Sequence, residues 1–302
     1  MDKAMATAVV LCLAAAAAAQ VGGNSSYSES GAHGSAEQHQ AQLRSVGKDD
    51  LPTGANASYV DASVLLNQPA DSYVAVFGVA SEGLTPAICG SKSEATIQAL
   101  TAAWKALGVA PDDLATDWVA QTRLYGYEPK ADMLEEKLTG FELKQNVAVK
   151  YRDPALLPKL TLAAAGAEVF DLVKVDYVVT DLAAVRDRLM AAAAEVIKAK
   201  VARYDRLLGL HLQPPSQILA ERSAVYYPTQ MYDSYVARES EAVREVGDRP
   251  RYTVREARKS TTYFYNGLAA DGFDAVLNPV VTAPLVQFTL YLKLKCETAP
   301  AK

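Results

Sequence analysis

The sequence contains little cysteine and histidine, and this scarcity limits the chemistry that it can carry. Its 302 residues include three cysteines and three histidines. His33 and His39 stand in a polar stretch near the N-terminus, so His211 alone belongs to the part with regular apolar periodicity. No cysteine pair has the spacing of a structural zinc site. We therefore expect neither a metal site nor a cofactor.

Motifs for common reactions are missing as well. The sequence has no GxxxxGKS or GxxxxGKT phosphate loop, no GxGxxG after a predicted strand and no GxSxG nucleophile turn. Cys89 and His211 could form a thiol–imidazole pair, but nothing in the sequence places them together. Paired carboxylates such as Asp112–Asp113 stand in predicted turns, where solvation or capping explains them. We predict that the protein is not an enzyme, and a hydrolase without recognisable motifs is the least favoured alternative.

The sequence also lacks a basic excess and a second long apolar run. Its net charge is −5 and its isoelectric point is about 5.4. A surface that binds nucleic acid needs positive charge to neutralise phosphates, so we expect no nucleic-acid partner. After the N-terminal run, no segment has the roughly 18 consecutive apolar residues of a membrane span. We therefore expect no integral membrane segment once that run is removed.

The N-terminus is typical of a secretory signal peptide. Lys3 precedes the apolar run ATAVVLCLAAAAAA, and small residues stand before Gln20. We predict a signal peptide over residues 1–19 and export to the periplasm or the extracellular space. The stretch that follows is rich in Ser, Gly and Gln, so residues 20–58 are predicted to be a disordered linker. Residues 59–302 then form one domain, or two subdomains that divide near residue 151.

Two cysteines, Cys89 and Cys296, remain after removal of the signal peptide. In an oxidising compartment they could form a disulfide. Alternatively, they are two separate buried thiols. Cys296 alternates in phase with the apolar residues of its predicted strand, which fits either alternative.

Apolar periodicity predicts an α+β fold in which antiparallel sheets pack against about three helices. Strands are expected over residues 71–83, 116–129, 139–153, 171–181, 217–227 and 283–297. Helices are expected from a Ser91–Glu94 capping box to Gly108, from Asp153 to about Ala165, from a Thr180 or Asp181 cap to Gly209, and over Tyr235–Val246. Clean alternation in 139–153 predicts that one face of that strand packs and the other meets water.

Two local features carry interaction hypotheses. Four tyrosines lie close together in the sequence: Tyr226, Tyr227, Tyr232 and Tyr235. Aromatic residues are enriched at interface hot spots, so this cluster contributes either to self-association or to the local packing of a hairpin. Lys200 falls within the apolar stripe of the longest predicted helix. We favour an amine that reaches past the core to water over a salt bridge.

The order of these elements resembles the SIMPL-domain family, which includes exported bacterial envelope proteins. The similar segments are SEATIQALTAAWKALGVAPDDLATDWVAQTRLYGYEP, GFELKQNVAVKYRDPALLPKLTLAAAGAEVFDLVKVDY, AAAAEVIKAKVARYDRLLGL and the last strand. The resemblance covers roughly residues 62–297. It implies an α+β fold, export and a tendency to self-assemble, and it transfers no catalytic residue.

Together these observations predict an exported, non-enzymatic SIMPL-like protein that forms homo-oligomers and has an envelope or stress-related role. The alternative is a secreted module that captures a small ligand or a peptide between sheet and helix. A pocket of several hundred Å³ would favour the module. Large exposed apolar patches would favour assembly.

Overall fold

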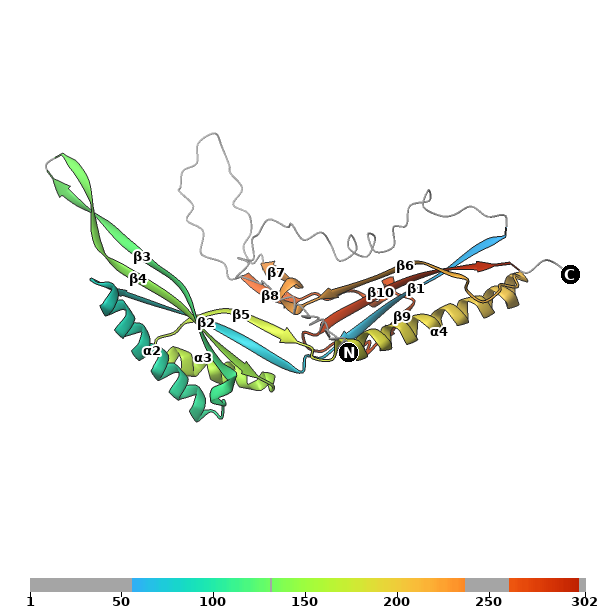
Figure 1. The fold of residues 1–302 in the computed structure, drawn as a ribbon, viewed down its shortest axis with the longest axis horizontal. Coiled ribbons are helices and arrows are strands. Elements are labelled where there is room, and N and C mark those ends of the chain that lie inside the picture. The colour runs from blue at the N-terminus through green and yellow to red at the C-terminus, as the bar shows by residue number, and fades with distance from the viewer. Residues whose placement is uncertain (1–55, 131, 237–260, 299–302) are drawn as a thin grey trace, which may run out of the picture.

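The fold consists of two four-stranded sheets at opposite ends of an elongated molecule (Figure 1). The computed structural model describes residues 56–298, apart from residue 131 and residues 237–260. In this part of the chain the strands are antiparallel with one exception, and three α-helices cover the sheets, which confirms the predicted α+β class. The predicted signal peptide lies outside the described residues, as does the predicted linker except for its last residues, where Ala57 and Ser58 begin a strand.

The first sheet, which we call the arm sheet, has the strand order β3-β4-β2-β5. Its strands are β2 (Ser72–Gly83), β3 (Leu114–Lys130), β4 (Met133–Tyr151) and β5 (Asp171–Val178). The helices α2 (Pro86–Ala106) and α3 (Leu157–Gly166) supply the other side of its core. Trp104 packs on Phe77 with 5.1 Å between ring centroids, and its indole N–H donates to the Leu160 carbonyl at 3.0 Å.

The alternation predicted for β4 is confirmed. Leu143, Val147, Val149 and Tyr151 are buried, whereas Lys144 and Lys150 on the other face are exposed. The start of α2, in contrast, was predicted too late. Thr85 caps this helix by accepting a bond from the Ile88 N–H, and Pro86 occupies the first helical position, so the Ser91–Glu94 pair lies inside the helix.

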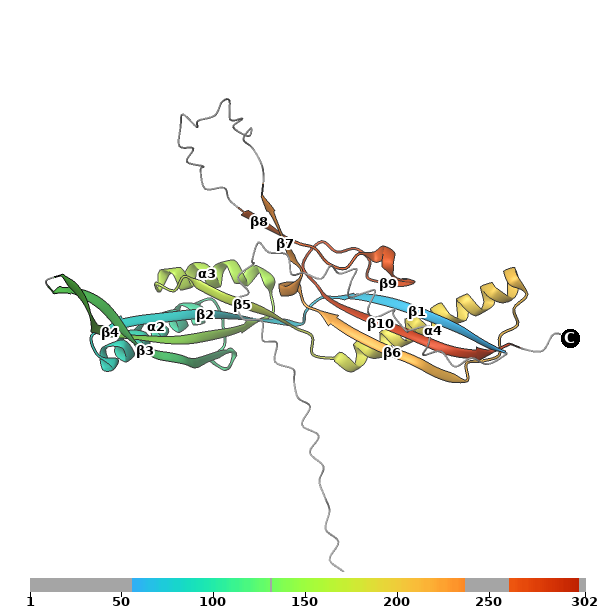
Figure 2. The same cartoon turned by 90° about the horizontal axis from the view of Figure 1, so that it is seen from above.

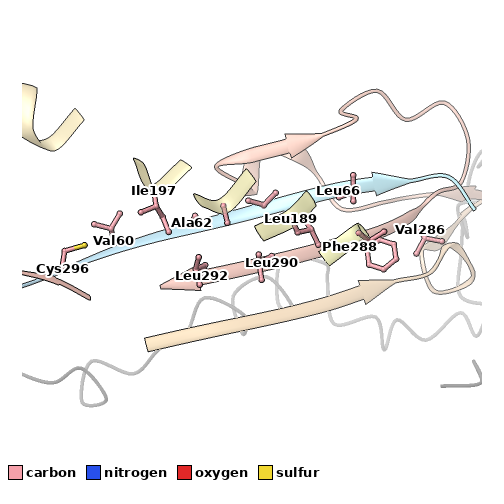
Figure 3. Packing of buried hydrophobic residues seen from close by; sticks show 13 residues of the cluster. Val60, Ala62, Leu66, Leu189, Ile197, Val286, Phe288, Leu290, Leu292 and Cys296 are labelled. Atoms are coloured by element: carbon pink, nitrogen blue, oxygen red, sulfur yellow. The ribbon is translucent and has the colours of Figure 1, made fainter. Parts of the chain in front are cut away.

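The second sheet, which we call the α4 sheet, has the order β6-β10-β1-β9. Its strands are β1 (Ala57–Gln68), β6 (Gln217–Tyr226), β9 (Ala275–Leu277) and β10 (Val286–Glu297), and β9 runs parallel to β1. The helix α4 (Leu182–Leu208) lies on one face. Figure 3 shows alternate residues of β1 and β10, such as Ala62 and Leu290, packed against Leu189 and Ile197 of α4.

The chain passes between the two sheets twice, at residues 69–71 and at 179–181, and a carboxylate holds these crossings together. Asp71 accepts hydrogen bonds from the backbone N–H and the hydroxyl of Thr180, both at 2.7 Å. The next residue, Asp181, caps α4 by accepting the Ala184 N–H at 2.9 Å. The sequence left Thr180 and Asp181 open as the cap; the structure assigns the cap to Asp181 and uses Thr180 at the crossing.

A two-stranded hairpin, β7 (Tyr232–Val236) with β8 (Thr261–Tyr265), stands off the line of the two sheets (Figure 2). The helix predicted over Tyr235–Val246 is therefore wrong for its first two residues, which lie in β7; the rest falls outside the described residues. Near residue 151, the boundary considered between two subdomains, β4 ends, but β5 returns to the same sheet. No helix among the described residues is both long and apolar enough to cross a membrane.

Candidate functional site

The longest hairpin of the arm sheet extends beyond its neighbours. The last pair between β2 and β4 is Gly83 with Phe141, so residues 124–130 of β3 and 133–140 of β4 pair only with each other. We call these two segments the arm, and Figure 1 shows it projecting from the end of the molecule. At its root the backbones approach closely, since a Cβ on Gly140 would lie 2.8 Å from the Gly83 carbonyl oxygen.

One face of the arm is mostly apolar and bare, and Glu136 is the charged residue on it. Directly paired residues of antiparallel strands share a face, and Tyr125 pairs with Leu138, Tyr127 with Glu136 and Pro129 with Leu134. The exposed fractions of its large apolar residues are 52% for Tyr125, 71% for Tyr127, 67% for Leu134 and 45% for Leu138. We call these four residues the apolar face of the arm. Neither α2 nor α3 covers them, because both helices end their packing on the body of the sheet.

The opposite face of the arm is charged and internally neutralised. Lys130 lies 3.1 Å from Glu135, and Lys137 lies 2.8 Å from Glu128. Both pairs are well exposed, and Met133 near the tip is the apolar exception on this face. The arm is therefore amphipathic, although it is only one sheet layer thick.

A second candidate site lies beneath the C-terminal half of α4. A helix covers about two strands, because helices pack 8–10 Å apart and strands lie about 4.8 Å apart. In the α4 sheet the helix packs mainly on β1 and β10 and leaves β6 bare, so Ile218 of β6 is 60% exposed. Ligand sites typically have volumes of roughly 300–1,000 Å³. The pocket here has a volume of about 510 Å³ and is lined by α4, β10 and the segment 211–215.

The thiol–imidazole pair considered for Cys89 and His211 does not form. Cys89 lies in α2 on the arm sheet, where its thiol is 3.2 Å from the Phe141 carbonyl oxygen, whereas His211 follows the end of α4 on the other sheet. His211 instead contacts the Asp205 carboxylate at 2.6 Å. Among the described residues, no group of three or more His, Cys, Asp or Glu side chains is arranged to hold a metal ion.

The two cysteines are separate buried thiols. Cys296 belongs to the core under α4, and burial raises its pKa. Cys89 is equally buried but lies in α2, which packs on the arm sheet, and both are free. The structure therefore has two separate thiols and no disulfide between them, because α2, which carries Cys89, and β10, which carries Cys296, face different cores.

The tyrosine cluster contacts the rest of the chain. Tyr227 packs against the α4 core, and Tyr232 meets Tyr265 edge to face at 6.1 Å between centroids. Tyr232 is also hydrogen-bonded to Tyr177 of β5. Tyr226 is half-buried, and the side chain of Tyr235 lies outside the described residues. These contacts favour local packing for Tyr227 and Tyr232; a role of the cluster in self-association stays a prediction.

Lys200 makes the salt bridge that the sequence analysis had ranked second. Its amine lies 2.8 Å from the Asp274 carboxylate and donates to the Asp61 carbonyl at 2.9 Å. It reaches these groups at the edge of β1, where β9 does not extend. Burial opposes the charge of Lys200, but the hydrogen bonds and charges of Asp274 and Asp61 together outweigh it, so its pKa is raised.

Sequence reasoning missed the arm and strand β1. The prediction of a strand over 116–129 was correct, but residues 133–138 were not predicted to extend β4. The available signal was weak: Leu134 and Leu138 lie on one face of the strand, but Glu136 between them on that face is charged.

The fold thus defines an α+β protein with two sheets, each covered by helices on one face, and with a projecting amphipathic arm. The match to a known family agrees with this: residues 58–261 match SIMPL, described as a protein of unknown function (DUF541). The chain therefore belongs to the SIMPL family. A search of curated proteins found no match to the chain.

Proposed function

We propose that this SIMPL protein is exported, is not an enzyme, and assembles with copies of itself through the apolar face of the arm, in an envelope or stress-related role. The observation that carries the proposal is the bare apolar face on a ribbon of two strands. An isolated two-stranded hairpin is marginally stable in water, and extra layers or strands are needed to support it. A partner that covers Tyr125, Tyr127, Leu134 and Leu138 supplies such a layer.

A second copy of the chain fits this face. Two arms stacked with their apolar faces together cover all four residues from each copy, at roughly 1.5–3 kcal/mol for each fully buried leucine. Glu136 shares this face, so its carboxylate has to stay at the edge of the contact, in water. Their charged faces then point outward, where the Lys130–Glu135 and Lys137–Glu128 pairs remain in water. The contact is self-complementary, as a two-fold interface requires.

A lipid surface fits the arm less well. Peripheral binding to anionic membranes relies on clusters of Lys and Arg next to the apolar residues. The arm carries Glu128, Glu135 and Glu136 against Lys130 and Lys137, and therefore offers no cationic excess.

Light scattering on the secreted form tests the assembly. We expect a mass that is a multiple of the monomer, and we expect the combined replacement of Tyr125, Tyr127, Leu134 and Leu138 by Ser to reduce it to the monomer. The matched control replaces Glu128, Lys130, Glu135 and Lys137 by Ser on the other face and keeps the assembly. Circular dichroism verifies that both variants are folded.

Two results would contradict the proposal: a monomeric wild type, or an assembly that survives the apolar replacements. Sedimentation with vesicles of anionic and zwitterionic lipid is a further measurement. Vesicle binding that disappears with the apolar replacements, while the mass stays unchanged, would assign the face to a membrane instead.

Export is supported by the N-terminal apolar run and by the family, which is generally associated with exported proteins. Fusion of residues 1–24 to an alkaline phosphatase that lacks its own signal tests it, because that enzyme becomes active only outside the cytoplasm. We expect activity from the fusion and its loss when Val9, Val10 and Leu11 are replaced by Asp. An inactive wild-type fusion would refute export by this segment.

A further inference from the structure

We propose that the pocket beneath α4 binds a neutral aliphatic molecule, such as a medium-chain alcohol or a single uncharged acyl chain. The proposal gives the ligand-binding alternative a location and a ligand class. It is independent of the arm, because the pocket belongs to the α4 sheet and the arm to the other sheet.

The walls of the pocket are preformed. α4 ends at Gly209, which takes the left-handed conformation with φ 63° and turns the chain back toward the sheet. The segment that follows is tied to β10, since the Gln213 N–H donates to the Glu297 carbonyl at 2.8 Å and the Ser216 N–H donates to the Lys295 carbonyl at 2.9 Å. Between these ties, Pro214 and Pro215 form a stiff end wall.

The interior of the pocket is aliphatic. Ile197 and Val201 of α4 face Leu292 and Leu294 of β10 across it, and Leu212 closes the side. The described residues that line it include no Phe, Tyr or Trp, and the one ring among them is the His211 imidazole, which contacts Asp205. A planar aromatic ligand would therefore find little ring surface to stack on, whereas a flexible chain can follow the branched side chains.

The charged side chains at the rim already have partners. Asp205 is held by His211 at 2.6 Å, and Lys198 is held by Glu195 at 2.8 Å. An ionic head group would have to compete with these pairs and lose water as it approaches the apolar wall. Gln213 is the neutral polar group at the rim, and its amide can exchange hydrogen bonds with a hydroxyl. The geometry therefore favours a neutral polar head.

The floor of the pocket continues along β6. Ile218 pairs with Leu294 and shares its face, and Val225 shares a face with Phe288 further along. Ile218 and Val225 are both exposed. A chain longer than the pocket can extend over Ile218, so affinity should keep rising with chain length until it meets Glu221 and Ser223, which lie on this face before Val225.

Isothermal titration calorimetry with 1-octanol, 1-nonanol and 1-decanol tests the site. We expect one site per chain and an affinity that rises roughly fourfold with each added methylene, as full burial of a methylene predicts. Octanoate and octylammonium should bind at least tenfold more weakly than 1-octanol. Saturable binding of the ions that equals that of the alcohol would overturn the neutral class.

Substitutions in α4 locate the binding. Ala194 lines the pocket, and Ala194→Phe should fill it and reduce the affinity for 1-decanol by at least tenfold. Ala191 lies in the same helix, is exposed and does not line the pocket, so Ala191→Phe should bind as the wild type does. Val201→Asn is the second variant, to be used if circular dichroism finds Ala194→Phe unfolded.

The proposal fails if the wild type shows no saturable binding, or if a folded pocket variant binds with unchanged affinity. The same titration on the variant with Ser at the apolar face of the arm separates the two proposals. Unchanged alcohol binding in that variant is expected. Loss of binding there, with retention in Ala194→Phe, would place the ligand on the arm and overturn the pocket.

Discussion

Single charged residues hold the open parts of this fold, and Lys200 is the clearest example. An edge strand exposes unpaired carbonyl groups, and an inward-pointing lysine is one way to occupy them. Here the amine bonds the Asp61 carbonyl and the Asp274 carboxylate, which also accepts the Ser63 N–H at 2.8 Å. Burial opposes ionisation of Asp274, but the bonds from Lys200 and Ser63 outweigh it and lower its pKa.

Replacing Lys200 by Met should therefore destabilise the fold by about 1–3 kcal/mol near neutral pH, because Asp274 loses its cation. The lowered pKa of Asp274 stabilises the fold above the unfolded value of about 3.9, and this gain is lost as the pH falls through the folded pKa. The raised pKa of Lys200 stabilises below about 10.4, and that gain is lost as the pH rises through the folded pKa. The difference in the free energy of urea unfolding between the wild type and Lys200→Met should thus be largest at pH values between about 4 and 10.

Lys198→Met is the matched control for Lys200→Met. Lys198 also pairs with a carboxylate, but its side chain is 72% exposed, against 21% for Lys200. Exposed pairs contribute about 0–1 kcal/mol, so this variant should unfold close to the wild type. Equal losses in the two variants would mean that the edge position of Lys200 has no special effect.

Asp71 stabilises the crossing between the sheets in a pH-dependent way. The Thr180 backbone N–H and then its hydroxyl lower the pKa of this carboxyl. Asp71→Ala should reduce the free energy of unfolding by about 1 kcal/mol at pH 7. Because a lowered pKa stabilises only above the unfolded value, the difference should shrink as the pH falls below about 4. A difference that is the same at pH 3 and pH 7 would contradict the role of the charge.

At the scale of elements, local signals in the sequence predicted α4 well. Its cap, apolar stripe and terminal glycine all lie within the helix or directly beside it, so they depend little on the rest of the fold.

Replacing the cap of α4 tests its contribution. Asp181→Ala should destabilise the fold by about 1 kcal/mol, and Asp181→Ser should destabilise it much less. Asp187→Ala, an exposed change within the same helix, should have almost no effect on the urea midpoint.

Elements that depend on distant partners were not predictable in the same way. β1 is buried on both faces, because residues such as Leu65 and Asn67 are covered as well as Ala62 and Val64, so it lacks simple alternation. The short β9 exists only through its pairing with β1. The start of α2 was predicted too late because Thr85 and Ser91 both carry a hydroxyl that can cap a helix. Only the path of the chain after β2 selects Thr85 as the cap.

The candidate sites also combine local features, which the sequence indicates, with features that depend on distant partners. Tyr125 and Tyr127 of the arm's apolar face alternate in the sequence, but Leu134 and Leu138 are separated by Glu136 on the same face. The exposure of all four depends on β2 ending at Gly83, which the sequence does not specify. The pocket depends on α4 covering β10 and leaving β6 bare, which is a matter of packing between elements far apart in the chain. Neither could be located from periodicity alone.

At the scale of the whole molecule, a series of tyrosines connects the two sheets. Tyr151 stacks on Tyr73 at 5.3 Å, and Tyr73 meets Tyr177 edge to face at 5.2 Å. Tyr177 bonds Tyr232, which meets Tyr265. The Tyr265 hydroxyl donates to the Leu285 carbonyl at 3.1 Å, directly before β10. Burial is the main cause of the raised pKa of Tyr177, followed by the neighbouring tyrosines. The series therefore links the arm sheet, the β7–β8 hairpin and the α4 sheet.

If this series holds the two sheets together, Tyr232→Ser should destabilise the crossing without changing the assembly. We expect a loss of about 2 kcal/mol on urea unfolding, since a half-buried ring is removed, and about 1 kcal/mol for Tyr177→Phe, which loses only the hydroxyl. Hydrogen exchange at residues 179–181 should become faster, because the Thr180 N–H bond to Asp71 opens more often. Tyr127→Ser, which removes an exposed ring of the arm, is the control and should leave this exchange unchanged. If Tyr232→Ser instead lowers the mass in light scattering and leaves stability and exchange as in the wild type, Tyr232 acts between copies of the chain and the cluster of Tyr226, Tyr227, Tyr232 and Tyr235 belongs to the assembly interface.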